Sequence, residues 1–178
     1  IANTGMNITR EIANGSFETN FSFPENARSG NYLLIVKVYE EVEGVEANKG
    51  ESSITIYVEQ TPRSIDIAES SQNVKPGENV VFKPTIYDQA GDMVEGEVGL
   101  KFYDNNGNLF FQKILNSGQE EEIYFETNSS PGYWKVDANG LGLESERLFY
   151  IEELKKASFN VVNDTLTVTN VGNIKYKN

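Results

Sequence analysis

Hydrophobic and polar residues alternate with a period of two along most of this chain. In residues 54–59, Ile, Ile and Val alternate with Thr, Tyr and Glu, and residues 80–87 place Val, Phe, Pro and Ile on one side. Because successive side chains of a strand point to opposite faces of a sheet, this alternation predicts half-buried β-strands. Turn-forming sequences separate these runs: Pro76-Gly77, Ala90-Gly91-Asp92, Asn106-Gly107, Ser117-Gly118 and Pro131-Gly132.

Seven strands are predicted between about residues 61 and 153. Their approximate spans are 64–68, 79–88, 94–103, 108–115, 120–127, 132–139 and 143–152. This length and strand number are typical of one immunoglobulin-like β-sandwich, so the predicted fold class is all-β. The loops at 88–92 and 104–108 are expected to close hairpins, and residues 152–157 could form a single helical turn.

The chain also repeats itself. Without gaps, Asn3 matches Asn105, and in the same register Phe23 matches Phe125. Both segments then enter a strand through a Gly-Asn-Tyr or Gly-Tyr-Trp sequence, at residues 30–32 and 132–134. Both close on an aromatic and acidic strand, at 56–59 and 149–152. This shared order of elements predicts tandem modules.

The repeat predicts three parts of unequal completeness. Residues 1–60 match the C-terminal half of a module, residues 61–153 form a complete sandwich, and residues 154–178 resemble the opening strands of a further module. The first residue, Ile1, is interpreted as a processed end or an internal cut. Half a sandwich leaves strand edges and apolar faces uncovered, so a longer parent chain or a neighbouring chain is expected to complete both halves.

Composition narrows the possible functions. The net charge of −12 would repel nucleic acid and anionic membranes. The chain has no Cys and no His, which removes a thiolate nucleophile, the commonest general base and the usual zinc ligands. No run approaches the roughly 20 apolar residues of a membrane helix. We therefore expect a protein that is not an enzyme and that needs no cofactor, nucleic acid or membrane insertion of this segment.

Two stretches resemble a known group. Residues 76–80, PGENV, followed by residues 86–96, IYDQAGDMVEG, resemble a pattern of bacterial and archaeal Ig-like and macroglobulin-type modules. Residues 166–174, LTVTNVGNI, resemble the opening strand of Ig-like repeats in archaeal S-layer-related surface proteins. The resemblance implies tandem repetition, display at the cell surface and no catalysis. It supplies no catalytic residue.

Five Asn-x-Ser/Thr acceptors indicate N-glycosylation of a secreted chain, with the composition of the chain as the alternative explanation. They are Asn7, Asn14, Asn20, Asn128 and Asn163. Asn128 is the most accessible candidate, because a Ser- and Pro-rich loop surrounds it.

Oxygen ligands for Ca²⁺ could come from Asp88, Asp92 and Asp104, but Asp is also an ordinary turn residue. The stretch beginning at Asp104 has Leu109 where a calcium loop needs Gly, so turn formation is the favoured explanation and no metal site is predicted.

Two further features have a structural and a functional interpretation. Glu120, Glu121 and Glu122 are adjacent on a strand, so they point to opposite faces and are expected at a solvated strand end, not across a catalytic cleft. Trp134 is predicted to pack in the core, and the alternative is an exposed platform that stacks on a sugar.

Three functions remain open. The preferred one is an extracellular structural or adhesive spacer whose partners are neighbouring modules of the same or adjacent chains, together with surface glycans or proteins. The second is an assembly subunit in which strands around residues 165–169 complete the half-module of the next chain. The third is a carbohydrate-binding module, which requires exposed aromatic side chains.

Overall fold

A computed structural model describes residues 8–10 and 15–176 of the chain. Strands and loops make up the described residues, and no helix long and apolar enough to cross a membrane occurs among them. The chain divides into two compact units. Unit 1 comprises residues 1–61 together with the loop Gln89–Asp92, and unit 2 comprises Pro62–Asp88 and Met93–Asn178.

Unit 1 contains one long antiparallel hairpin. Strand β1 (Gly30–Val42) pairs with β2 (Val45–Val58), and a bulge interrupts the register between Val38 and Glu40. The two-residue turn between the strands has positive φ at both positions, 51° and 79°, which is the twist that a short hairpin requires. Apart from residues near the start of β1, most side chains of this hairpin are exposed.

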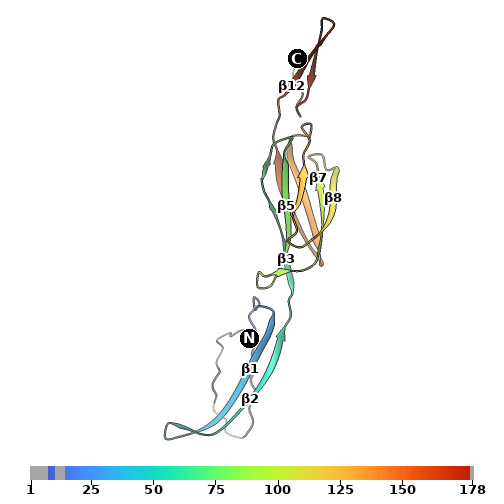
Figure 1. The fold of residues 1–178 in the computed structure, drawn as a ribbon. Helices are drawn as coiled ribbons and strands as arrows, with labels where there is room; N and C mark the ends of the chain where they lie inside the picture. The colour runs from blue at the N-terminus through green and yellow to red at the C-terminus, as the bar shows by residue number, and fades with distance from the viewer. Residues whose placement is uncertain (1–7, 11–14, 177–178) are drawn as a thin grey trace. The chain divides into compact units, whose positions relative to one another are not determined.

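Unit 2 contains two facing sheets and a separate hairpin (Figure 1). One sheet has the strand order β4-β11-β10-β7-β8, and the other has the order β3-β5-β6 with β9 also paired to β5. The strands are β3 (Pro62–Glu69), β4 (Asn73–Val74), β5 (Asn79–Asp88), β6 (Met93–Val94), β7 (Glu97–Tyr103), β8 (Leu109–Asn116), β9 (Glu121–Tyr124), β10 (Gly132–Gly140) and β11 (Leu143–Ile151). The separate hairpin is β12 (Ala157–Val162) with β13 (Thr165–Asn170).

The chain passes back and forth between the two sheets several times, and this distribution of strands defines an immunoglobulin-like β-sandwich. Strands β7, β10 and β11 lie in one sheet, while β3, β5 and β9 lie in the other. Strand β4 crosses to the larger sheet and pairs in parallel with β11. The predicted all-β, Ig-like fold class is therefore confirmed.

The core lies between the two sheets and is rich in phenylalanine. Phe82, Phe102, Phe125 and Phe149 are fully buried, and their rings contact one another edge to face, with the Phe82 and Phe102 centroids 4.8 Å apart. Such pairs add about 0.5–1.5 kcal/mol each to the stability that comes from area burial. Trp134 completes this cluster and is 3% exposed. The interpretation of Trp134 as an exposed sugar platform is therefore wrong.

Three local expectations need correction. The strand predicted at 94–103 is two strands, because β6 stays beside β5 while β7 enters the other sheet. The expected hairpin at 88–92 is consequently limited to the two pairs Ile86–Val94 and Tyr87–Met93. Residues 152–156 form no helical turn, since the chain runs directly from β11 into β12. The hairpin at 104–108 is confirmed, and it joins β7 to β8.

Candidate functional sites

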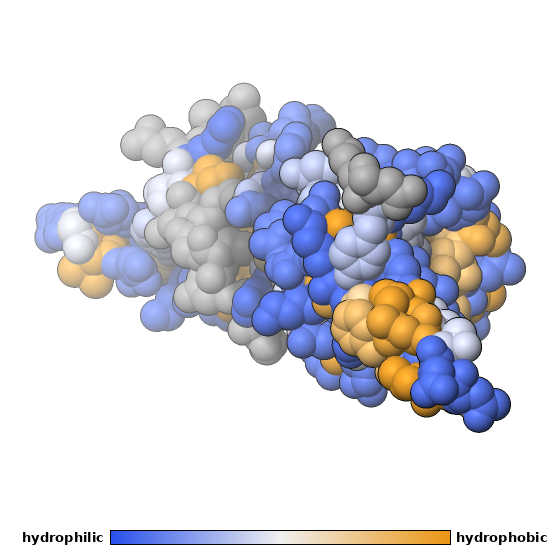
Figure 2. All heavy atoms as spheres, turned by 90° about the horizontal axis from the view of Figure 1, so that it is seen from above, coloured by the Kyte–Doolittle hydropathy of each residue, from blue (hydrophilic) through white to orange (hydrophobic). Residues whose placement is uncertain are grey.

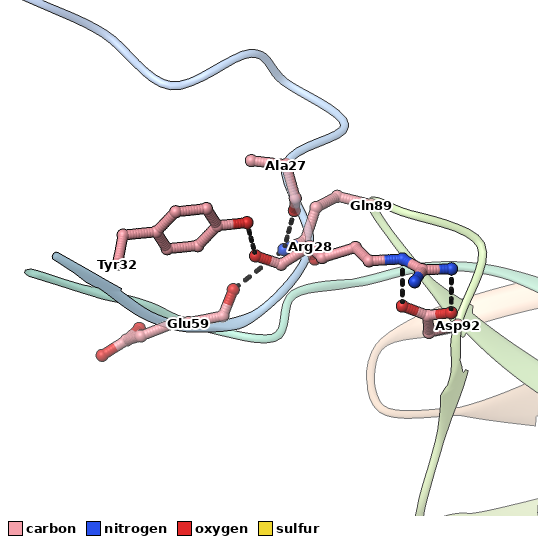
Figure 3. Close-up of polar contacts among 6 residues, drawn as sticks. All are labelled: Ala27, Arg28, Tyr32, Glu59, Gln89 and Asp92. Atoms are coloured by element: carbon pink, nitrogen blue, oxygen red, sulfur yellow. Dashed lines mark hydrogen bonds and ion pairs between the residues drawn. The ribbon is translucent and has the colours of Figure 1, made fainter. Parts of the chain in front are cut away.

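A glutamine side chain holds three backbone segments of unit 1 together (Figure 3). Gln89 Nε2 donates hydrogen bonds to the carbonyl oxygens of Ala27 at 3.0 Å and Glu59 at 2.9 Å. The Thr61 N–H donates to Gln89 Oε1 at 2.8 Å, and the Gln89 N–H donates to the Thr61 carbonyl at 3.1 Å. We name this four-bond arrangement a carboxamide clamp.

The same arrangement recurs in unit 2 around an asparagine. Asn173 Nδ2 donates to the carbonyl oxygens of Ser129 at 3.0 Å and Glu152 at 2.7 Å. The Leu154 N–H donates to Asn173 Oδ1 at 2.6 Å, and the Asn173 N–H donates to the Leu154 carbonyl at 3.1 Å. Every donor and acceptor of the first clamp therefore has a counterpart in the second.

The residues beside each clamp also correspond. Tyr32 donates its hydroxyl to the carbonyl of Arg28, four residues earlier, and Trp134 donates its indole N–H to the carbonyl of Ser130 in the same way. Each ring lies two residues after a glycine with positive φ, Gly30 at 131° and Gly132 at 126°. A side chain would strain that backbone, so glycine is what allows both strands to begin there.

The ring partners follow the same pattern. Phe23 lies 4.9 Å from Tyr32 between ring centroids, and Phe125 lies 5.6 Å from Trp134. The hairpin β1–β2 then pairs Tyr32 with Ile56, as β10–β11 pairs Trp134 with Phe149. The two segments matched in the sequence thus share a positive-φ glycine at the strand start, an aromatic anchor and a strand pairing.

A glycine makes the second clamp possible. A Cβ atom on Gly172 would overlap the carbonyl oxygen of Leu154 and approach the Lys156 nitrogen to 2.9 Å. The Asn170 side chain accepts the Gly172 N–H at 3.0 Å and so shapes the loop that presents Asn173. Sequence reasoning missed both clamps, because Gln89 and Asn173 act only when three distant segments meet.

A different kind of site lies on the outward face of the larger sheet of unit 2. Tyr133, which is 68% exposed, contacts Tyr150 edge to face at 5.1 Å between ring centroids. Lys135 Nζ lies 5.2 Å from the centroid of the Tyr103 ring and 3.0 Å from Asp137 Oδ1. The hydrogen bond to Asp137 raises the pKa of Lys135, so its ammonium group stays charged. We name this surface the aromatic sheet face.

Tyr103 and Lys135 also line a polar groove of about 360 Å³ on this sheet. Its lining combines amine and carboxylate side chains, namely Lys101, Lys135, Asp137, Glu144 and Glu146. Such a mixture of donors and acceptors can hydrogen-bond a hydroxyl-rich ligand, and the exposed Tyr133 ring is available to stack on it.

The predicted glycosylation residues fall into two groups. Asn20, Asn128 and Asn163 are exposed, while Asn7 and Asn14 lie outside the described residues. Asn128 lies in the loop before β10 and borders a hollow of about 430 Å³. Asn163 occupies the turn of β12–β13 with a φ of 47°. Glycosylation of all five stays a prediction.

Each of the three aspartates considered for calcium has its own environment in the structure. Asp88 is buried at the end of β5, and Asp92 forms an ion pair with Arg28 at 3.3 Å. The Asn108 side chain and the backbone N–H groups of Asn108 and Asn106 donate hydrogen bonds to Asp104, and these bonds hold the pKa of its carboxyl below the usual value. Among the described residues, no three acidic side chains gather into a possible metal site.

The carboxylates at 120–122 interact with separate partners. Glu120 pairs with Lys83 at 3.5 Å, and Glu121 pairs with Lys113 at 2.7 Å. Glu122 accepts a hydrogen bond from Asn79 at 3.0 Å. These contacts link residues 120–122, at the start of β9, to β5 and β8.

The strand topology defines an immunoglobulin-like sandwich protein, and two solved structures are similar to it at low sequence identity. The amphioxus IgVJ-C2 molecule is 16% identical, with a TM-score of 0.31, over 68% of this chain and 59% of that one. The PKD domain of the human VPS10 domain-containing receptor SorCS2 is 19% identical, with a TM-score of 0.36, over 64% of this chain and 93% of that one. No family model and no curated protein matches the chain. Scores this low transfer no function.

Proposed function

We propose that this chain is part of a non-catalytic, extracellular structural or adhesive protein built from tandem Ig-like modules, of the bacterial or archaeal surface type. The observation that supports it is the recurrence of the carboxamide clamp, centred on Gln89 in unit 1 and on Asn173 in unit 2. In each clamp the carboxamide follows a hairpin, β3–β5 or β12–β13, and its backbone partners precede that hairpin, so the arrangement would recur once for every module. Two such clamps in one chain fit a serial array.

The proposed modules keep the boundaries suggested by the repeat. Residues 1–60 supply the closing hairpin of one module, 61–153 a complete sandwich, and 154–178 the opening hairpin of another. In this arrangement β1–β2 corresponds to β10–β11, and β12–β13 corresponds to β3–β5. The S-layer or macroglobulin type of protein is part of the proposal and rests on the sequence resemblance.

Display outside the cell is supported by the acceptor asparagines. Asn20, Asn128 and Asn163 are all exposed, so a glycan could be attached to each without disturbing the core. The high acidic charge of −12 is compatible with a protein that must stay soluble at high local density.

Labelling of intact cells tests the proposed location. Cells that express the native protein are treated with a membrane-impermeant amine reagent, and the purified protein is weighed by mass spectrometry before and after glycan release. We expect labelling without lysis and a loss of mass in hexose-sized steps. A protein that is labelled only after lysis would contradict the proposal.

A second candidate function is carbohydrate binding by the aromatic sheet face. The favouring observation is the exposed Tyr133, which contacts the half-buried Tyr150 and lies two residues along β10 from Lys135, a residue that lines the polar groove. Titration of the chain with surface oligosaccharides should show saturable binding that Tyr133→Ala abolishes. Tyr57→Ala is the control, because Tyr57 is a 64% exposed tyrosine at the unit 1 position that corresponds to Tyr150, and its cross-strand partner there is Asn31 and not a second aromatic ring. Equal binding by both variants would exclude this site.

A further inference from the structure

One face of the hairpin β12–β13 carries a cluster of four apolar side chains, and no described segment of the chain covers them. The register pairs Phe159 with Val168 and Val161 with Leu166, so these four side chains point to the same side. They are 70%, 56%, 66% and 60% exposed, respectively. Hydrophobic side chains gather in a surface cluster on the face of the molecule shown in Figure 2. A contiguous apolar surface of this kind is characteristic of a contact site.

The corresponding hairpin in the same chain shows what such a face packs against. Strands β3 and β5 pair Ile65 with Ile86 and Ile67 with Pro84, and these isoleucines are no more than 6% exposed. On the same face, Phe82 packs against Phe149 of β11 with ring centroids 5.3 Å apart. The cover is therefore a β10–β11 type of hairpin from the opposite sheet.

The chain has a second hairpin of this covering type, and among the described residues no second sheet packs against it. Strands β1 and β2 pair Tyr32 with Ile56 and Leu34 with Ile54, on the face that corresponds to Trp134 and Phe149. Ile54 is 58% exposed. The two open faces of the chain thus correspond to the two halves of one sandwich.

The charges of the two ends are complementary. Residues 1–60 carry four Lys or Arg against nine Asp or Glu, a net charge of −5. Residues 154–178 carry four Lys against one Asp, a net charge of +3, although the whole chain has −12. Opposite charges steer the two surfaces together, and two like ends repel each other.

We propose that the apolar face of β12–β13 binds the β1–β2 hairpin of a second copy of this chain, so that copies associate head to tail. The partner is another copy because this chain itself supplies both halves with matching faces and opposite charges. A head-to-tail contact uses two different surfaces and does not close on itself, so association continues into a linear assembly. This inference rests on the module equivalence used for the proposed function, but not on the location of the protein.

The first measurement is sedimentation of the 178-residue chain over a range of concentrations. We expect the average mass to rise continuously with concentration and to fall again when salt screens the opposite charges. A chain that stays monomeric up to about 1 mM, where an association worth about 4 kcal/mol would be half complete, overturns the proposal.

A mixing experiment then identifies the two surfaces. Phe159→Asp blocks β12–β13 and leaves β1–β2 intact, whereas Ile54→Asp blocks β1–β2 and leaves β12–β13 intact. Each variant alone should be monomeric, and an equimolar mixture should form one-to-one dimers and nothing larger. In the mixture, each variant binds through the hairpin that its substitution does not touch. Local unfolding around the substituted residue therefore does not prevent the expected dimer. Thr167→Asp, on the polar face of β13, should assemble like the unmodified chain.

Three other outcomes would each overturn the proposal. Finite dimers formed by Ile54→Asp alone would show that β12–β13 pairs with itself. Failure of the mixture to associate while the unmodified chain does would place the contact elsewhere. A longer native polypeptide that remains monomeric would show that its own continuation covers the hairpin. In each of these cases, labelling of the native protein on intact cells would still support the proposed surface location.

Discussion

The hairpins β3–β5 and β12–β13 have the same alternation of apolar side chains and differ in what covers them. Ile67 of β3 is 2% exposed, while Phe159 of β12 is 70% exposed. Each hairpin is followed by a carboxamide clamp, centred on Gln89 or Asn173, so the two hairpins occupy equivalent places in the chain. The apolar alternation of a strand therefore specifies which face will be buried, but it does not specify which partner covers that face. That partner must come from another part of the chain or from another molecule.

The largest expected contrast is between a covered and an uncovered phenylalanine. Phe82→Ala should destabilise unit 2 by about 3–5 kcal/mol, because it removes a ring from a close-packed core. Phe159→Ala should change the stability by less than about 0.5 kcal/mol in dilute solution, where its ring already contacts water. Urea unfolding followed by fluorescence measures both, since Trp134 is the single tryptophan and lies in the core of unit 2. An equally large loss for Phe159→Ala would mean that the hairpin is covered in the monomer.

The next comparison is between the two carboxamide clamps, and we expect the loss of either one to have the same effect. Asn173→Ala removes three side-chain hydrogen bonds, which should lower the local stability by roughly 1–3 kcal/mol. Exchange of the Leu154 amide hydrogen should then accelerate about 10- to 100-fold. Gln89→Ala should do the same for the Thr61 amide.

The control for the clamp is Asn160→Ala, which changes an exposed asparagine of β12. It should leave exchange at both amides unchanged. If Asn173→Ala accelerates exchange and Gln89→Ala does not, the two clamps are not equivalent. The module correspondence would then lose its main support.

Much of the fold could be predicted because side-chain alternation and turn residues are local signals. The strand at 79–88 and the burial of Trp134 follow from the period of two and from the Gly-Tyr-Trp strand start. The division of 94–103 into β6 and β7 could not be seen, because both pieces have strand-like sequences and the change of sheet depends on tertiary packing.

The candidate sites were less predictable than the fold. An alternating strand places Tyr133 on the outside, but its contact with Tyr150 depends on the register between β10 and β11. The clamps are harder still, since Gln89 lies 28 residues from Thr61, and Asn173 lies 44 residues from Ser129. No local sequence pattern predicts that one carboxamide side chain will form hydrogen bonds with backbone groups of segments so far apart.

A smaller contrast concerns the aromatic anchors of the two corresponding hairpins. Tyr32→Phe keeps the ring beside Phe23 but loses the hydrogen bond from the hydroxyl to Arg28. We expect a loss of about 1 kcal/mol in the local stability of unit 1, measured by hydrogen exchange of the β1–β2 amides. Tyr57→Phe is the control, because that ring is exposed. Equal effects of the two substitutions would show that the Tyr32 hydroxyl anchors nothing.

The smallest effect is expected at the turn between β7 and β8. The Asn108 side chain and two backbone N–H groups stabilise the charged Asp104 carboxylate and lower its pKa. A carboxyl whose pKa is lower in the folded state stabilises the protein above its unfolded pKa of about 3.9, and this contribution is lost as the pH falls through the folded value. Asn108→Ala should therefore raise the pKa of Asp104 toward 3.8, as carboxyl NMR shifts would show. Asn106→Ala should raise it less, because that substitution keeps the backbone N–H that Asp104 accepts. The accompanying change in stability should be small, since solvent screens this partly exposed turn, and an unchanged pKa in both variants would show that the turn does not hold the carboxylate.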